Sequence, residues 1–96
     1  MMKVLITGAS SGIGRDMARA LCNNENELVL VARDEAKLRD VKEELEKTGC
    51  KIETISMDLS KEENCVEIHK RVKNVDILIN NARFWGLRKF HKDRFK

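Results

Sequence analysis

Near its N-terminus the chain carries the octapeptide Thr7-Gly8-Ala9-Ser10-Ser11-Gly12-Ile13-Gly14. An aliphatic run precedes it and apolar residues at helical spacing follow it, so a strand is predicted to pass into a helix through a glycine turn. Backbone N–H groups and the helix dipole at such a turn can receive a pyrophosphate. We interpret Gly8 as the tight turn, Gly12 as the point of phosphate approach and Gly14 as a close helix–strand contact.

The rest of the apolar pattern alternates between strand and helix. Continuous or alternating apolar runs predict four strands, over residues 3–7, 28–32, 51–56 and 75–79. A second helix is expected to begin after Asp34 as its N-cap and to end at Gly49, and a third to open with a capping box at residues 60–63. The βαβαβαβ order indicates an α/β fold, a Rossmann-like parallel sheet with helices on both faces.

Composition places the chain among soluble globular proteins of one domain. It has 96 residues, of which 42% are hydrophobic and 36% charged. This balance is typical of a folded globular domain and not of a disordered chain. No apolar run approaches the roughly 18 residues of a membrane span, and no signal sequence is evident, so we expect a cytoplasmic protein without a membrane partner. Its cysteines, Cys22, Cys50 and Cys65, form no Cys-x-x-Cys pair and are interpreted as small buried residues rather than a disulfide framework or zinc site.

A change in composition at Ala82 divides the chain into a body, residues 1–82, and a basic, aromatic tail, residues 83–96. The tail holds six Lys and Arg against one Asp, and all four aromatic residues of the chain. The body has a small net negative charge. Nucleic-acid binding through the tail is therefore disfavoured, because six basic residues beside an acidic body are a modest electrostatic footprint.

The body closely resembles the short-chain dehydrogenase/reductase family over residues 3–82. Thr7, Gly8, Gly12 and Gly14 match the family signature Thr-Gly-x-x-x-Gly-x-Gly. Asp58-Leu59 follows the third strand, where the family places an acidic residue near adenine, and Asn80-Asn81-Ala82 ends the fourth, where the family has Asn-Asn-Ala-Gly.

This resemblance implies a nicotinamide-dinucleotide-binding half-domain with strand order 3-2-1-4. The fourth strand is then a sheet edge through which copies of the chain are expected to associate. The cofactor-binding residues implied are Gly8, Ser10, Ser11, Gly12, Ile13, Gly14, Arg33, Asp58, Leu59, Asn80, Asn81 and Ala82.

The tip of the second strand predicts the choice of cofactor. An acidic residue there hydrogen-bonds the ribose 2′-hydroxyl of NAD and repels a 2′-phosphate. In this chain Ala32 occupies that position and Arg33, whose guanidinium can bind a phosphate, follows it. We therefore expect NADP rather than NAD, with Asp34 acting as a helix cap and not as an NAD-selecting acid.

The catalytic half of the resembled family is missing. Its members use a tyrosine as general acid, with a lysine four residues later, and this chain contains no tyrosine. Arg83 also replaces the glycine of Asn-Asn-Ala-Gly. The chain alone is expected not to catalyse. Two interpretations stand: an NADP-binding part of a short-chain oxidoreductase, truncated or split from its catalytic half, and a non-catalytic nucleotide-binding or interaction module.

The tail is predicted to be a frameshift product of a longer reductase gene. If the first base of the Arg83 codon is dropped, residues 83–95 can be read as Gly-Phe-Gly-Asp-Leu-Gly-Asn-Phe-Thr-Lys-Thr-Asp-Leu, which restores Asn-Asn-Ala-Gly. Most positions depend on the synonymous codons chosen, but the glycine read across Trp85 and Gly86 does not. The DNA sequence tests this prediction. If the shifted frame soon reaches a stop codon, or lacks Tyr-x-x-x-Lys, the frameshift prediction fails and the alternative is a genuine short protein with a functional tail.

Overall fold

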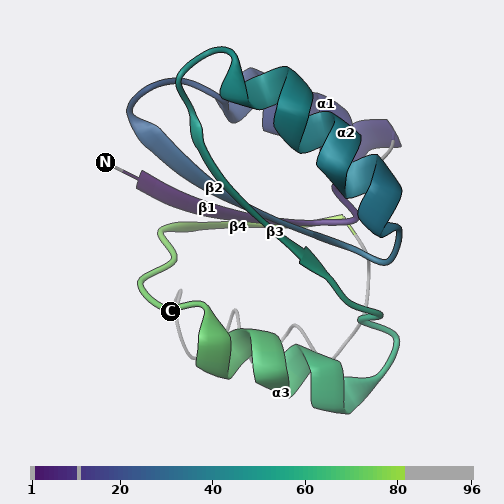
Figure 1. The fold of residues 1–96 in the computed structure, drawn as a ribbon. Coiled ribbons are helices and arrows are strands. Elements are labelled where there is room, and N and C mark those ends of the chain that lie inside the picture. The colour runs from purple at the N-terminus through teal and green to yellow at the C-terminus, as the bar shows by residue number, and fades with distance from the viewer. Residues whose placement is uncertain (1, 11, 82–96) are drawn as a thin grey trace.

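The computed structural model describes residues 2–10 and 12–81, which form one parallel sheet between two layers of helix. The elements in chain order are β1 (Met2–Thr7), α1 (Gly12–Leu21), β2 (Asn26–Ala32), α2 (Glu35–Glu46), β3 (Lys51–Ser56), α3 (Glu62–Arg71) and β4 (Ile77–Asn80). The strands lie in the order β3-β2-β1-β4, and every pairing is parallel. Helices α1 and α2 cover one face and α3 the other (Figure 1). The predicted fold class and strand order are confirmed.

The two central strands are apolar where both of their faces are covered, over residues 4–6 of β1 and 28–32 of β2. Successive side chains of a strand point to opposite faces. On β1, Val4 and Ile6 therefore pack in the core under α1 and α2, while Leu5 packs in the core on the α3 side. On β2, Leu28 and Leu30 face the first core, and its two valines face the second.

The last strand begins later than its apolar run suggests. Val75 was expected to open it, but pairing with β1 begins at Ile77, opposite Val4. Val75 instead packs in the α3-side core. Between them, Asp76 accepts a hydrogen bond from Lys3 N–H at 2.8 Å through its carboxylate and donates its own N–H to Lys3 O at 2.8 Å.

One of the two predicted helix caps is confirmed. The Asp34 carboxylate accepts a hydrogen bond from Lys37 N–H at 3.1 Å and caps α2. The predicted capping box at residues 60–63 is wrong, because α3 begins at Glu62 and its N-cap residue Lys61 makes no side-chain cap bond. The Ser60 hydroxyl instead donates to the Asp58 carboxylate at 2.7 Å. A hydrogen bond to an ionised acceptor is stronger than one between two neutral groups, such as a hydroxyl and a helix N–H.

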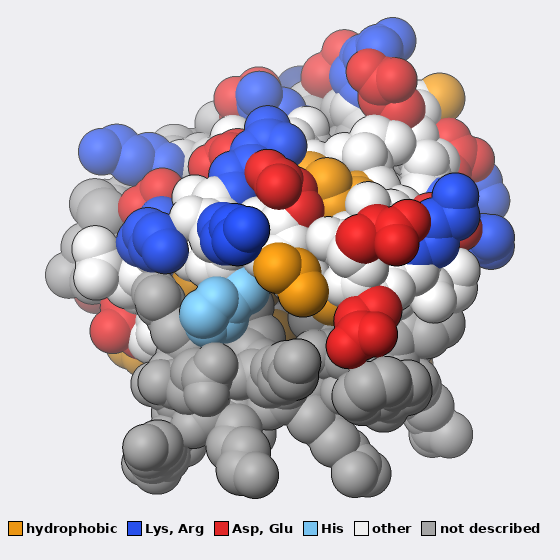
Figure 2. Space-filling view, turned by 90° about the horizontal axis from the view of Figure 1, so that it is seen from below, with side chains coloured by type: hydrophobic (Ala, Val, Ile, Leu, Met, Phe, Trp, Pro, Cys, Tyr) orange, Lys and Arg blue, Asp and Glu red, His pale blue; other side chains and the backbone are white. Residues whose placement is uncertain are grey.

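Acidic and basic side chains are intermixed over the described part of the surface seen from the α3 side (Figure 2). Exposed hydrophobic side chains are few, and Val66 on α3 is 39% exposed. None of the helices described here is long and apolar enough to cross a membrane.

A glycine lets α1 start close against the end of β1. A Cβ built on Gly14 would lie 2.1 Å from Gly8 O and 3.1 Å from Ala9 Cα, both backbone atoms that cannot move aside alone. By contrast, a Cβ on Gly12 would meet no atom within 4 Å, although Gly12 has φ +58°. The close contact predicted for Gly14 is therefore confirmed.

We expect Gly14→Ala to destabilise the chain by about 1–3 kcal/mol, the usual cost of forcing an extra methyl into a packed site. Gly12→Asn is the matched control, since asparagine tolerates a positive φ and the space there is open. Urea unfolding followed by circular dichroism measures both. A Gly14→Ala protein no less stable than Gly12→Asn would contradict the contact.

Salt bridges join α1 to α2 on the outer side of the molecule. Glu44 on α2 accepts hydrogen bonds from Arg19 at 2.8 and 3.1 Å and from Arg15 at 3.0 Å. Bonds from Arg19 first, and then from Arg15, lower the pKa of Glu44 from 4.5 to about 2. The carboxylate therefore stabilises the folded chain whenever it is ionised.

Because the folded pKa of Glu44 is depressed, its contribution is complete above about pH 4.5 and is lost as the pH falls towards 2. Glu44→Gln should lower the melting temperature slightly at pH 7, as is usual for exposed ion pairs, and the difference from wild type should vanish near pH 2. Glu43→Gln is the control, because Glu43 is an exposed neighbour that forms no salt bridge with any residue that the structure describes. Thermal melts across this pH range would contradict the assignment if the two variants behave alike.

Candidate functional site

The glycine-rich loop lies at the carboxyl end of β1 and leads into α1. Gly8 has φ +63° and Gly12 φ +58°, a region that residues with a Cβ rarely adopt. These two glycines turn the chain so that the N-terminus of α1 points at the end of the sheet. Unpaired N–H groups and the positive end of the helix dipole then face any group bound there.

A partly buried polar network ties this loop to the end of β4. Thr7 is fully buried, and its hydroxyl donates to Asn80 Oδ1 at 3.2 Å and accepts from Asn81 N–H at 3.0 Å. Asn81 Nδ2 donates to Gly8 O at 3.4 Å. The predicted site residues Asn80 and Asn81 therefore position the glycine loop through hydrogen bonds.

A pocket of about 880 Å³ opens beside the loop, over the carboxyl ends of β1, β2 and β3. Its volume is in the range of sites that hold a small organic ligand. Residues from the loop, from the start of α2 and from the segment after β3 line it: Gly8, Ser10, Val31, Ala32, Arg33, Asp34, Lys37, Met57, Asp58, Leu59 and Ser60.

Five predicted site residues thus come together in the pocket: Gly8, Ser10, Arg33, Asp58 and Leu59. Three more begin α1 beside it, namely Gly12, Gly14 and Ile13, whose side chain is 70% exposed. Ser11 and Ala82 lie outside the described residues, as does the predicted tail, residues 83–96.

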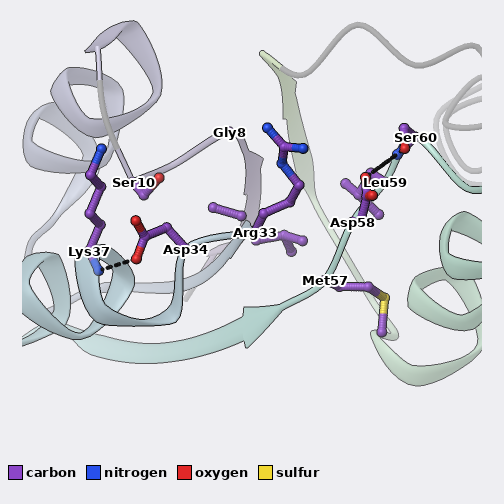
Figure 3. A pocket seen from close by; sticks show the side chains of 11 residues that line it. Gly8, Ser10, Arg33, Asp34, Lys37, Met57, Asp58, Leu59 and Ser60 are labelled. Carbon is purple, nitrogen blue, oxygen red and sulfur yellow. Dashed lines mark hydrogen bonds between the residues drawn. The ribbon is translucent and has the colours of Figure 1, made fainter.

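Arg33 directly follows β2, and its side chain rises between Asp34 and Lys37 on one side and Asp58 on the other (Figure 3). Its carbonyl oxygen accepts a hydrogen bond from the Ser56 hydroxyl at 2.9 Å, which fixes the backbone at this point. The guanidinium makes no hydrogen bond or salt bridge with the part of the chain that the structure describes. A cation held by its backbone but not by its side chain can receive an anion.

Asp58 presents an ionised carboxylate to the opposite wall of the pocket. The Ser60 hydroxyl and N–H, at 2.7 and 3.0 Å, hydrogen-bond its Oδ1 and lower its pKa, with smaller contributions from the charges of Arg33 and Lys61. Asp58 also accepts, through its carbonyl oxygen, a bond from Asn64 Nδ2 at 2.7 Å. The segment after β3 is therefore held rigidly against the start of α3.

Sequence reasoning missed Lys37, which also lines the pocket. Lys37 lies four residues after Arg33, in the first turn of α2, and its side chain lines the same pocket (Figure 3). The spacing of two basic residues around the Asp34 cap was a signal that could have identified it. The side of the pocket formed by the end of β2 and the start of α2 thus carries two cations, Arg33 and Lys37, of which only Arg33 was predicted.

The comparisons with known proteins agree with this architecture. The sequence model of the family described as short chain dehydrogenase matches residues 2–95. An 11-beta-hydroxysteroid dehydrogenase of Pinus massoniana is 42% identical over 84 residues, which cover 82% of this chain and 24% of that protein. A very-long-chain 3-oxoacyl-CoA reductase of Kluyveromyces lactis is 39% identical over 84 residues, covering 81% of this chain and 24% of the relative.

Solved structures extend the likeness to three dimensions. A short-chain dehydrogenase from Sphingobium yanoikuyae in complex with NADPH superimposes with a TM-score of 0.78 at 37% identity, covering 85% of this chain and 34% of that one. A metagenomic short-chain oxidoreductase in complex with NADP gives a TM-score of 0.79 at 36% identity, with 84% and 38% covered. The chain therefore spans a quarter to little more than a third of these proteins, and it belongs to the short-chain dehydrogenase family.

Proposed function

We propose that this chain is the NADP(H)-binding part of a short-chain oxidoreductase that interconverts carbonyls and alcohols. The observation that carries the proposal is the pocket at the carboxyl edge of the sheet, with the glycine loop on one side and Arg33 on the other. The Arg33 guanidinium bonds to none of the residues that the structure describes. In open parallel sheets, ligands bind in this crevice. The NADPH and NADP complexes among the solved relatives support the same class of ligand.

The residues present fit a dinucleotide phosphate. Gly12 leaves open space where a side chain would otherwise project, and the N-terminus of α1 supplies N–H donors for a pyrophosphate. Leu59, largely buried in the α3-side core, adds an apolar contact to the pocket wall next to the ionised Asp58. The nicotinamide of a bound cofactor would supply or accept the hydride. The described residues would bind and orient the adenosine half of that cofactor.

The preference for NADP over NAD follows from the charges around the ribose end. Asp34, the one carboxylate next to Arg33 in sequence, is engaged as the cap of α2. Arg33 and Lys37 together can neutralise a 2′-phosphate, which an ionised acid at the strand tip would repel. The pocket is therefore proposed to discriminate by attraction of the phosphate rather than by recognition of the hydroxyl.

We expect this chain to bind NADPH more tightly than NADH, and Arg33→Ala to remove most of the difference. Loss of one charge-assisted contact costs about 1.5–3 kcal/mol, which is roughly a 10- to 100-fold loss of NADPH affinity. NADH affinity should hardly change. Lys37→Ala should cause a smaller loss, because its ammonium is a flexible point charge rather than a rigid fork.

Titration calorimetry with 2′,5′-ADP and with 5′-AMP sharpens this test, because the two probes differ only by the 2′-phosphate and occupy only the adenosine end of the site. Arg39→Ala is the matched control, since Arg39 is an exposed arginine on α2 that pairs with Glu35 at 3.7 Å and does not line the pocket. Equal affinity for the two probes in the unmodified chain would remove the selector role from Arg33. Binding of neither would favour the alternative of an interaction module.

Self-association through β4 is proposed on a separate observation. In the described sheet β4 pairs only with β1 and so occupies an edge, and exposed edges template pairing with other chains. Sedimentation velocity tests this: a monomer at all concentrations would count against it.

A further inference from the structure

Two cysteines meet at the end of the sheet opposite the pocket. Cys22 directly follows α1, and Cys50 directly precedes β3. The start of β2 lies between them, because Asn26 Nδ2 donates to Leu21 O at 2.9 Å and the Cys50 thiol donates to Asn26 O at 3.7 Å. Both cysteines pack on the core under α1 and α2.

The side chain of Cys22 contacts the segment that leads into Cys50. Cys22 Sγ lies 3.0 Å from Thr48 Oγ1 and donates to Leu45 O at 3.4 Å, so it is held against the end of α2, two residues before Cys50. Cys22 lies near enough to contribute, after burial, to the raised pKa of the Cys50 thiol. Helix α1, helix α2 and strand β3 thus converge on one pair of sulfur atoms.

The two thiols differ in access. Cys50 is 5% exposed, and burial, with the neighbouring Cys22 as the second cause, raises its pKa to about 12. Cys22 is only half-buried, which differs from the sequence expectation that all three cysteines are buried. An oxidant from solvent therefore reaches Cys22 first, while Cys50 remains a protonated thiol beside it.

We propose that Cys22 and Cys50 form an oxidation-sensitive pair that closes to an intramolecular disulfide in the presence of hydrogen peroxide. The third cysteine, Cys65, is isolated from this pair. It is buried in the core on the α3 side and donates to Leu59 O at 3.3 Å.

The chemistry proceeds in two steps. The Cys22 thiolate attacks one oxygen of the peroxide, the O–O bond breaks, and Cys22 becomes a sulfenic acid while hydroxide leaves and is protonated to water. Cys50 Sγ then attacks Cys22 Sγ, the S–O bond breaks, and the leaving hydroxide takes the Cys50 proton to form a second water. Overall, two thiols are oxidised and one peroxide is reduced to two waters.

The bond would close a loop that contains all of β2 and α2, and with them Arg33. Such a cross-link restricts the unfolded chain and so stabilises the folded one. The pair lies at the amino ends of β2 and β3, whereas the pocket lies at their carboxyl ends. Oxidation is therefore expected to raise the melting temperature and to leave nucleotide affinity unchanged.

The test treats the full chain with a small excess of hydrogen peroxide, blocks remaining thiols with N-ethylmaleimide under denaturing conditions, and digests it with trypsin. The peptides 20–33 and 48–51 should run as one linked species that dithiothreitol separates. Peptide 62–70, which contains Cys65, should carry the maleimide. The oxidised chain should melt at a higher temperature than the reduced chain in parallel scans.

Cys22→Ala should abolish the linked species, and Cys65→Ala, at the cysteine outside the pair, should retain it. The linked peptide in the wild-type chain keeps the test valid even if a variant fails to fold. Three alkylatable thiols after oxidation, a link through Cys65, a link only between chains, or an oxidised chain that melts no higher than the reduced one would overturn the proposal. If the chain binds no nucleotide but the linked species forms, the proposed function fails and this inference stands.

Discussion

The absence of a Cβ at Gly14 is the constraint on which the arrangement of this chain depends. A Cβ added at Gly14 would lie 2.1 Å from the carbonyl oxygen of Gly8, so only glycine allows α1 to approach the end of β1 this closely. That contact sets where α1 crosses the sheet and where its N-terminus points. Because Arg15 and Arg19 on α1 both pair with Glu44, it also influences how α2 lies beside α1.

The same edge of the sheet collects the polar groups because the strands are parallel. Carboxyl ends of β1, β2 and β3 meet there, and the chain order reverses between β1 and β4, where ligands of open α/β sheets bind. The buried hydroxyl of Thr7 would be costly without partners. Its bonds with Asn80 and Asn81 satisfy it and at the same time fix the loop that faces the pocket.

The charged side chains of the pocket are two carboxylates that have hydrogen-bonding partners, Asp34 and Asp58, and two cations, Arg33 and Lys37. Asp34 caps α2 and Asp58 is held by Ser60, so both carboxylates have defined positions and partners. Arg33 has its backbone fixed by Ser56 while its guanidinium remains directed into the pocket. A structure that orders two anions and leaves a cation available is suited to bind a further anionic group.

Local patterns in the sequence determined the fold class, the Asp34 cap and the close contact at Gly14, because each depends on residues near one another in the chain. The strand order pairs distant segments and was predicted through the family resemblance. Local patterns misplaced the start of β4 and the cap of α3, where the Asp76 carboxylate accepts from Lys3 N–H and the Asp58 carboxylate accepts from the Ser60 hydroxyl. They also gave no sign that Lys37 shares a pocket with Asp58, that Glu44 joins two helices, or that Cys22 meets Cys50. Those contacts connect segments about 20 or more residues apart, and only the packing of α1, α2 and β3 on the twisted sheet decides which side chains meet.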